Sequence, residues 1–72
     1  MKVSARNVLK GKVEKIVEGS VNCEVTIKIA PTVKVTSIIT KESVASLGLK
    51  KGKTAYAIIK ASSVMVGVDH DK

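Results

Sequence analysis

The stretch Val21-Asn22-Cys23-Glu24-Val25-Thr26-Ile27-Lys28-Ile29 alternates apolar and polar residues along its whole length. Successive side chains of a β-strand point to opposite faces of a sheet, so this alternation predicts a strand with one buried face. Gly19-Ser20 comes before the stretch and Ala30-Pro31-Thr32 follows it, and both are typical of turns. A half-buried strand in the middle of the chain therefore favours a sheet protein.

Further strands are expected on both sides of this one. Val, Ile and Ala supply most of the apolar mass, a mixture that suits pleated sheet better than helix. Gly11 interrupts the first of these segments, which indicates a bulge or the close approach of another backbone. In chain order, strands are predicted over residues 8–17, 21–29, 33–39, 54–60 and 64–68.

The segment between the third and fourth strands has a different period, which predicts a short helix. Thr40 can cap it, and Gly48 suits the left-handed position that follows a helix. Val44 and Leu47 lie three residues apart, on one face. Five strands with one short helix between the third and fourth form the element order of an OB-type barrel. The predicted fold class is therefore all-β, a small five-stranded OB-like barrel with that single helix.

The chain is short for a barrel that is stable alone. Its 72 residues are 44% hydrophobic, with no Phe or Trp and with Tyr56 as the single aromatic. A chain of this size buries only about 60% of the surface that it exposes when unfolded, so its stability is marginal. Cys23 is the single cysteine, so we expect a buried thiol and no disulfide. One domain is predicted over 1–68, stabilised further by oligomerisation or a ligand, with a frayed tail over 69–72.

The charge is strongly unbalanced. Lys and Arg total 13 against 6 acidic residues, which gives a formal net charge of +7. Such a field attracts anions, which include nucleic acid, anionic lipid and small oxyanions. No stretch approaches the roughly 18 apolar residues of a membrane span. Arg6 stands where a signal peptide would need its apolar segment, so a cytoplasmic protein without a membrane partner is expected.

Catalysis has little support in the sequence. The only histidine, His70, lies between two aspartates in the tail, and a metal site there would need more ligands. Cys23 has no histidine near it in the sequence, and no glycine-rich phosphate loop is present. We therefore expect a protein that is not an enzyme and that carries neither a cofactor nor a directly bound metal cation.

Groups that can donate hydrogen bonds to an anion gather in three places. Ser4, Ala5 and Arg6 precede the first strand, Thr40 and Ser43 occupy the first turn of the helix, and Lys60, Ala61 and Ser62 follow the fourth strand. The first turn of a helix has free backbone N–H groups and a favourable dipole. An ordinary interpretation is also open, in which Thr40 is only a cap, Ser62 lies in a turn, and Arg6 and Lys60 are surface charges.

Motifs along nearly the whole chain resemble the molybdate- and tungstate-binding Mop domain family, the molbindins. They are Ser4-Ala5-Arg6-Asn7 with Leu9-x-Gly11-x-Val13, Thr36-Ser37-Ile38-Ile39-Thr40-x-x-Ser43-Val44 with Leu47-Gly48-Leu49-x-x-Gly52, and Ala57-Ile58-Ile59-Lys60-Ala61-Ser62-x-Val64. Each motif alone is weak, whereas the full series in this order is specific.

The resemblance implies a small OB-like domain that assembles as a hexamer, a trimer of dimers, with tetrahedral oxyanions in pockets between subunits. By motif, Ser4, Arg6, Lys60 and the Ala61 backbone would form one part of a pocket. Thr40 and Ser43 would form the other part, from a neighbouring subunit. Ala5 and Ser62 complete the set of candidate oxyanion-binding residues.

Three classes of function remain. The leading hypothesis is non-enzymatic binding of molybdate or tungstate, for storage, buffering or homeostasis. The alternative is a nucleic-acid-binding OB-fold domain, which basic charge supports but which lacks stacking platforms, because Tyr56 is the only aromatic. A module for subunit interaction that holds an anion only incidentally is a third possibility.

Overall fold

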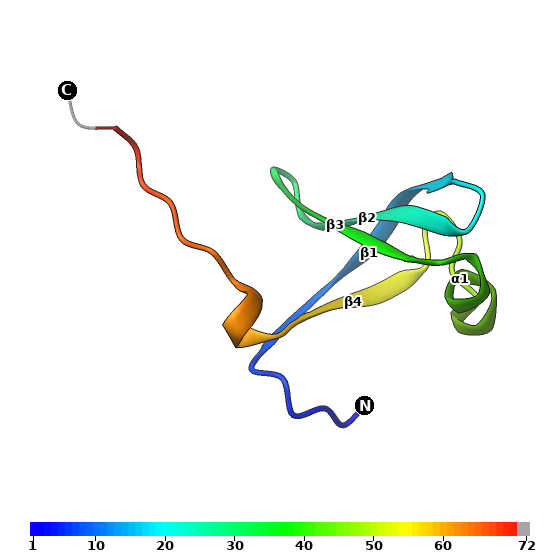
Figure 1. Cartoon of the computed structure of the whole chain (residues 1–72), viewed down its shortest axis with the longest axis horizontal. Helices are drawn as coiled ribbons and strands as arrows, with labels where there is room; N and C mark the ends of the chain where they lie inside the picture. Colours follow the sequence, from blue (N-terminus) through cyan, green and yellow to red (C-terminus); the bar gives the residue numbers. More distant parts are fainter. Residues whose placement is uncertain (71–72) are drawn as a thin grey trace.

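The computed structural model describes residues 1–70. Four antiparallel strands form one sheet in the order β3-β2-β1-β4, and Figure 1 shows how a short helix follows β3 at one end of it. The elements are β1 (Asn7–Glu18), β2 (Asn22–Ala30), β3 (Val33–Thr40), α1 (Lys41–Leu47), β4 (Thr54–Ile59) and the 3₁₀ turn η1 (Ala61–Ser63).

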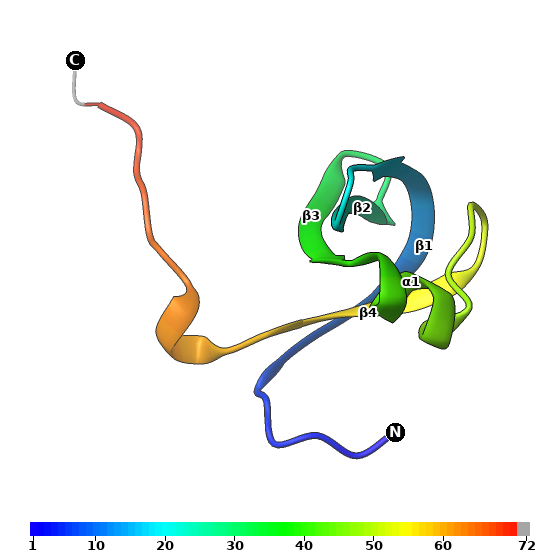
Figure 2. The same cartoon turned by 45° about the vertical axis from the view of Figure 1, so that its right-hand side comes forward.

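The alternation of apolar and polar residues in the middle of the chain corresponds to β2, which has one buried face. Cys23, Val25 and Ile27 are buried, and the latter two join Val13 of β1 and Ala57 of β4 in the core. Figure 2 shows the sheet curling around this face, so one side of every strand points inward. The predictions of a half-buried strand and of a buried cysteine are both confirmed.

Gly11 is required by a close contact between β1 and β2. A Cβ atom at this position would lie 2.4 Å from the carbonyl oxygen of Lys28 and 2.9 Å from Cδ1 of Ile29. The predicted close approach is therefore confirmed. The bulge itself lies further along, where the β1–β2 register shifts between Val13 and Lys15.

The predicted helix forms with the predicted caps. The N–H of Ser43 donates to Oγ1 of Thr40 at 3.0 Å, and Gly48 has a φ of 63°. Val44 packs against the core, whereas Leu47 is 59% exposed. The helix therefore contacts the sheet through less of its apolar face than the spacing predicted.

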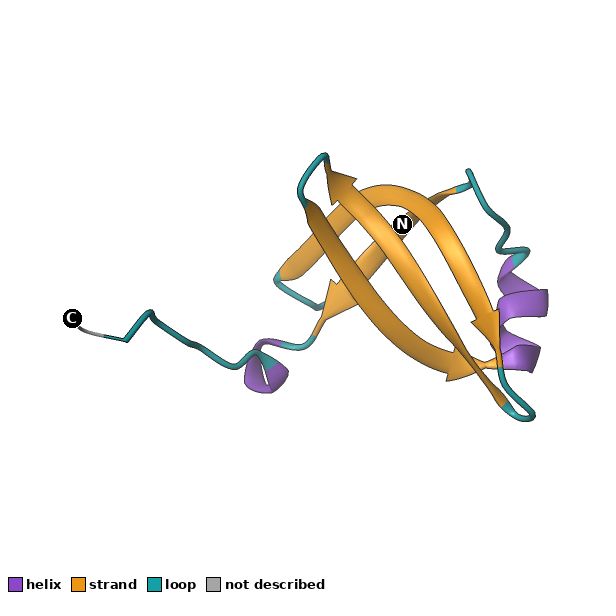
Figure 3. Ribbon diagram, turned by 90° about the horizontal axis from the view of Figure 1, so that it is seen from above, coloured by secondary structure: helices purple, strands orange, loops and turns teal. Residues whose placement is uncertain are grey.

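The predicted fifth strand over 64–68 is wrong for the single chain. After η1 the backbone has no regular secondary structure, and Met65, Val66 and Val68 are each at least 90% exposed. A strand needs a neighbour for its hydrogen bonds, and this segment leaves the sheet (Figures 1 and 3). Asp69 and His70 are also exposed and irregular, while the rest of the predicted tail, 71–72, lies outside the described residues.

The sheet is consequently an open, curled half-barrel. Its order leaves β3 and β4 as the two edges, with no strand of residues 1–70 joining them. The all-β class and the helix between the third and fourth strands are confirmed, but the five-stranded closure is not. Among residues 1–70, no helix is long and apolar enough to cross a membrane.

Candidate functional site

The start of β1 and the end of β4 lie side by side. The two strands are antiparallel, and Asn7 is the register partner of Ile59. Nδ2 of Asn7 also donates a hydrogen bond to the carbonyl oxygen of Ile59, at 3.3 Å. This pairing brings the segment before β1 next to the segment after β4, although more than fifty residues separate them in the chain.

A shallow hollow of about 590 Å³ forms where these two segments meet. Six of the eight candidate residues line it, together with one apolar side chain from β4. The lining residues are Ser4, Ala5, Arg6, Ile58, Lys60, Ala61 and Ser62. The structure thus gathers the first and third groups of predicted donors into one place.

Two cations give the hollow its electrostatic character. Arg6 and Lys60 are both exposed at its wall, and no carboxylate lines it. Across residues 1–70 the ion pair that forms joins Lys34 and Glu14, so no acidic side chain in that range neutralises either cation. Hydrogen bonds from charged donors are shorter and stronger than neutral ones, so this wall suits an anion.

The 3₁₀ turn holds the carboxyl end of β4 in position. The N–H of Ser63 donates to the carbonyl oxygen of Lys60 at 2.8 Å, and that of Val64 to Ala61 at 3.2 Å. Ile58 adds an apolar surface that the sequence reasoning missed. Its position two residues before Lys60 was the available signal, because alternate residues of a strand share a face.

Thr40 and Ser43 lie elsewhere in the chain. Figure 1 places α1 at the opposite end of the sheet from η1, so these two residues are not in the hollow of their own chain. Oγ1 of Thr40 donates to Oγ of Ser43 at 2.8 Å, so the hydroxyl hydrogen of Thr40 is used within the turn. One copy of the chain therefore carries two separate groups of candidate residues.

Metal-ligating side chains do not cluster. Within residues 1–70, no group of three or more His, Cys, Asp or Glu side chains is placed to hold a metal ion. Cys23 is buried in the core face of β2, and His70 is exposed beyond the sheet.

Comparison with known proteins identifies the class. Residues 3–66 match the TOBE domain. A Haemophilus influenzae protein named "Probable molybdenum-pterin-binding protein" is 55% identical over 69 residues, which cover 96% of this chain and 100% of the relative. The chain belongs to the TOBE domain family, and its similarity to molybdenum-pterin-binding proteins confirms the Mop resemblance.

Solved structures of relatives share the fold. MopII from Clostridium pasteurianum, in an apo form, is 45% identical with a TM-score of 0.87, over 93% of this chain and 100% of that one. ModG, described as a cytoplasmic molybdate-binding protein and solved with molybdate bound, is 51% identical with a TM-score of 0.90. That match covers 96% of this chain and 49% of ModG.

Proposed function

We propose that this protein is a non-enzymatic binder of molybdate or tungstate that holds the oxyanion between copies of the chain. The observation that carries the proposal is the hollow beside Lys60. It combines Arg6 and Lys60 with the hydroxyl-bearing residues Ser4 and Ser62, and it contains no carboxylate. The relatives supply the ligand class, because ModG binds molybdate and others are named for molybdenum-pterin binding.

The donor set fits a fully deprotonated tetrahedral dianion. Arg6 and Lys60 match its two negative charges, and each hydrogen bond to a charged group contributes roughly 1.5–3 kcal/mol. About four to six such bonds would provide the roughly 8 kcal/mol of a micromolar site after ordering costs. A protonated oxyanion such as hydrogen phosphate would prefer a carboxylate acceptor, and none lines the hollow.

A second copy would complete the pocket. Thr40 and Ser43 lie at the far end of the sheet from the hollow, so a pocket that uses both groups needs two chains. On binding, the hydroxyl of Ser43 could donate to the anion directly, and that of Thr40 could do so once it turns away from Ser43. Which copy supplies which group follows from the assembly, for which we propose the hexamer, a trimer of dimers.

The apolar surface supports assembly. A groove of about 670 Å³ on the concave side of the sheet is lined mainly by apolar residues, which include Val35, Ile39, Leu47, Leu49, Ala55 and Ile59. The segment 64–68 carries three side chains that are at least 90% exposed. Exposed apolar surface of this kind marks interfaces in soluble proteins. We propose that this segment of one copy covers the concave face of another.

The biological role that we propose is storage or buffering of the oxyanion in the cytoplasm. The absence of a cluster of metal-ligating side chains within residues 1–70 is compatible with binding alone. ModG, of whose length the match covers 49%, is itself described as cytoplasmic.

Thermal melting with competing ligands tests the function. Molybdate or tungstate at 100 times its dissociation constant should stabilise the protein by about 2.7 kcal/mol and raise its melting temperature. Sulfate should raise it less, because it is smaller, and single-stranded oligonucleotides should bind weakly and lose their binding in salt. Tight oligonucleotide binding at physiological salt, with no effect of either oxyanion, would instead establish the nucleic-acid function.

A further inference from the structure

The convex face of the sheet carries a row of lysines. Lys12 of β1 is the register partner of Lys28 of β2, and Lys28 is the partner of Lys34 of β3. Directly opposed residues of antiparallel strands share a face, and all three side chains are exposed. The residues that alternate with them, such as Val13 and Ile27, form the core on the other face.

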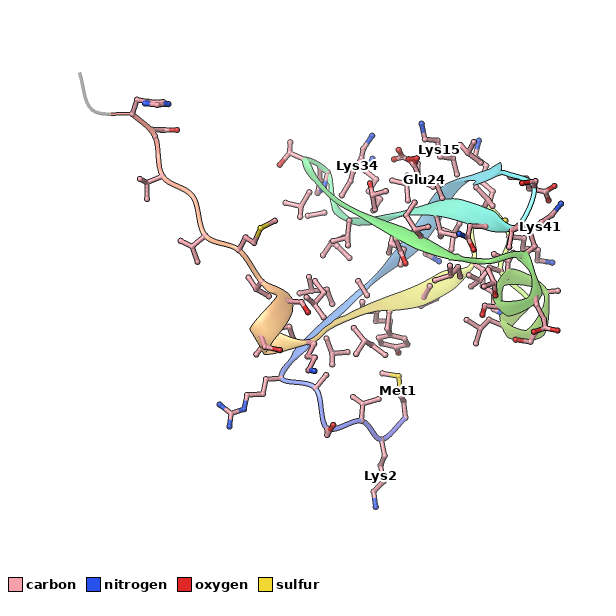
Figure 4. The ribbon with its side chains drawn as sticks, viewed as in Figure 1. Met1, Lys2, Lys15, Glu24, Lys34 and Lys41 are labelled. Atoms are coloured by element: carbon pink, nitrogen blue, oxygen red, sulfur yellow. The ribbon has the colours of Figure 1, made fainter. Side chains whose placement is uncertain are left out.

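The β-bulge in β1 adds a fourth lysine to this face. Val13 pairs with Ile27 inside, and the next paired residue of β1 is Lys15, opposite Thr26 on the convex side. In a regular strand without the bulge, Glu14 would point outward and Lys15 into the core. Figure 4 shows Lys15 and Lys34 on the same side of the molecule, away from Met1 and Lys2. We call Lys12, Lys15, Lys28 and Lys34 the lysine face.

One carboxylate is already bound on the lysine face. Oε2 of Glu14 lies 2.7 Å from Nζ of Lys34, and the contact spans from β1 to β3 across β2. The hydrogen bond from Lys34, with the charges of Lys28 and Lys15 nearby, lowers the pKa of Glu14 below its ordinary value. Three strands therefore direct positive charge toward a single carboxylate.

The remaining lysines are not neutralised. Within residues 1–70, Lys12, Lys15 and Lys28 form no ion pair, and neither does Glu24, which Figure 4 shows on the same side of the molecule as Lys15. Like charges directly opposite each other destabilise a sheet, so the row Lys12–Lys28–Lys34 carries a cost in the free chain. An anionic partner laid over the row would remove that repulsion.

The lysine face is separate from the oxyanion hollow. Lys12 lies opposite Thr54, at the start of β4, whereas the hollow is at the other end of that strand, beside Lys60. Five residues of extended β1 separate Asn7 from Lys12, which corresponds to about 17 Å along the strand. A partner on this face could therefore bind while the hollow holds its anion.

We propose that the lysine face docks an extended acidic segment of a partner protein. Glu14 demonstrates that a carboxylate fits between these lysines at hydrogen-bond distance. Alternate residues of an extended chain repeat every 6.8 Å or so on one side, and adjacent strands lie about 4.8 Å apart, distances that flexible lysines can bridge. Acidic residues at alternate positions would thus meet successive lysines.

Nucleic acid fits the lysine face less well. The side chains that alternate with its lysines on the convex side of β2 and β3 are Thr26 and Thr36. The one aromatic, Tyr56, is the partner of Lys10 on the edge strand β4, so at most a single ring could stack on a base. Glu14 lies within the face and would repel a phosphate, whereas its ion pair shows the geometry that a partner's carboxylate would adopt.

Binding of a synthetic peptide of alternating Glu and Ser residues tests the proposal. It would be measured on the full chain by fluorescence anisotropy at an ionic strength of about 0.15 M. A peptide with Gln in place of Glu is the ligand control. The variant Lys12→Gln/Lys28→Gln/Lys34→Gln should bind the acidic peptide at least roughly tenfold more weakly, because close charge pairs couple strongly.

The matched control removes the same charge from another surface. Lys41, Lys50 and Lys51 are exposed around α1, and their triple Gln variant should keep the peptide affinity within about twofold. Glu14→Gln frees Lys34 and should tighten peptide binding. Molybdate affinity and melting temperature, measured alongside, report whether each variant is folded.

Three results would overturn the proposal. The first is no binding of the acidic peptide by the wild-type chain. The second is an equal loss of affinity in the two triple variants, since net charge alone would then explain the binding. The third is an oligonucleotide that binds the same lysines more tightly than the peptide does.

Discussion

Arg6 and Lys60 decide whether the hollow is a binding site or ordinary surface. Both are exposed, and neither has an acidic partner within residues 1–70, which a solvated surface cation would equally show. The difference is their convergence with Ser4 and Ser62 on one hollow. In the free protein the two cations repel each other, and an anion between them relieves that repulsion.

Replacing Arg6 separates the two interpretations. Arg6→Ala should weaken oxyanion binding by more than about tenfold and leave the apo assembly at least as stable, because repulsion is relieved. Arg6→Lys should recover only part of the affinity, since an ammonium lacks the planar donor fork. Titration calorimetry measures both, and Lys2→Ala, an exposed cation that does not line the hollow, is the control. Unchanged oxyanion affinity in Arg6→Ala would show that Arg6 is an ordinary surface cation and not part of the binding site.

Gly11 gives a prediction about packing. Its missing Cβ leaves room for the carbonyl oxygen of Lys28, which an added methyl group would approach to 2.4 Å. Gly11→Ala should therefore lower the free energy of unfolding by about 1–3 kcal/mol, as overpacking does. Ser20→Ala, at an exposed position of the turn between β1 and β2, is the control. Denaturant unfolding that gives equal stability for both variants would contradict the contact.

Among the helices and strands, the sequence predicted correctly those features that depend on contacts between residues close in the chain or within its own sheet. The alternation in β2 predicted its buried face because the strand packs within the sheet of the same chain. The caps Thr40 and Gly48 predicted the ends of the helix because capping hydrogen bonds form between residues only a few positions apart. The segment 64–68 is the exception. It is apolar enough for a strand, but whether it becomes one depends on a neighbour, and the sheet of its own chain offers none at that position.

The segment 64–68 should matter for assembly. Val66→Asp places a charge on a side chain that is 90% exposed in the single chain and that we expect to be buried between copies. The variant should shift the proposed hexamer toward smaller species in sedimentation, because an unpaired buried charge is costly. The control Val21→Asp makes the same change at another exposed valine, in the turn between β1 and β2, and should leave the assembly intact. A full hexamer with Val66→Asp would exclude this segment from the interface.

The sequence predicted which residues form the candidate site but not how all of them are arranged in space. Motif similarity singled out Ser4, Arg6 and Lys60, and antiparallel pairing of β1 with β4 explains why they meet. Nothing local in the sequence places Thr40 and Ser43 relative to them. In the shared pocket that we propose, their relation would depend on contacts between copies, which have no signature in the hydropathy pattern of one chain.

In the whole molecule, the small core and the excess of positive charge both limit the stability of a single chain. Few side chains are fully buried, the barrel is open, and the formal net charge is +7. Assembly would bury the concave face, and bound anions would neutralise charge that otherwise repels. We therefore expect oxyanion and assembly to stabilise each other, so that molybdate also raises the concentration of denaturant needed to dissociate the hexamer.

The position of the anion tests the account most directly. Crystals grown with tungstate would locate the tungsten atom by its anomalous scattering. We expect it within hydrogen-bond reach of Arg6, Lys60 and the Ala61 backbone of one copy and of Thr40 and Ser43 of another. Tungsten bound away from the hollow, or held there by a single chain with Thr40 and Ser43 still bonded to each other, would contradict the shared pocket.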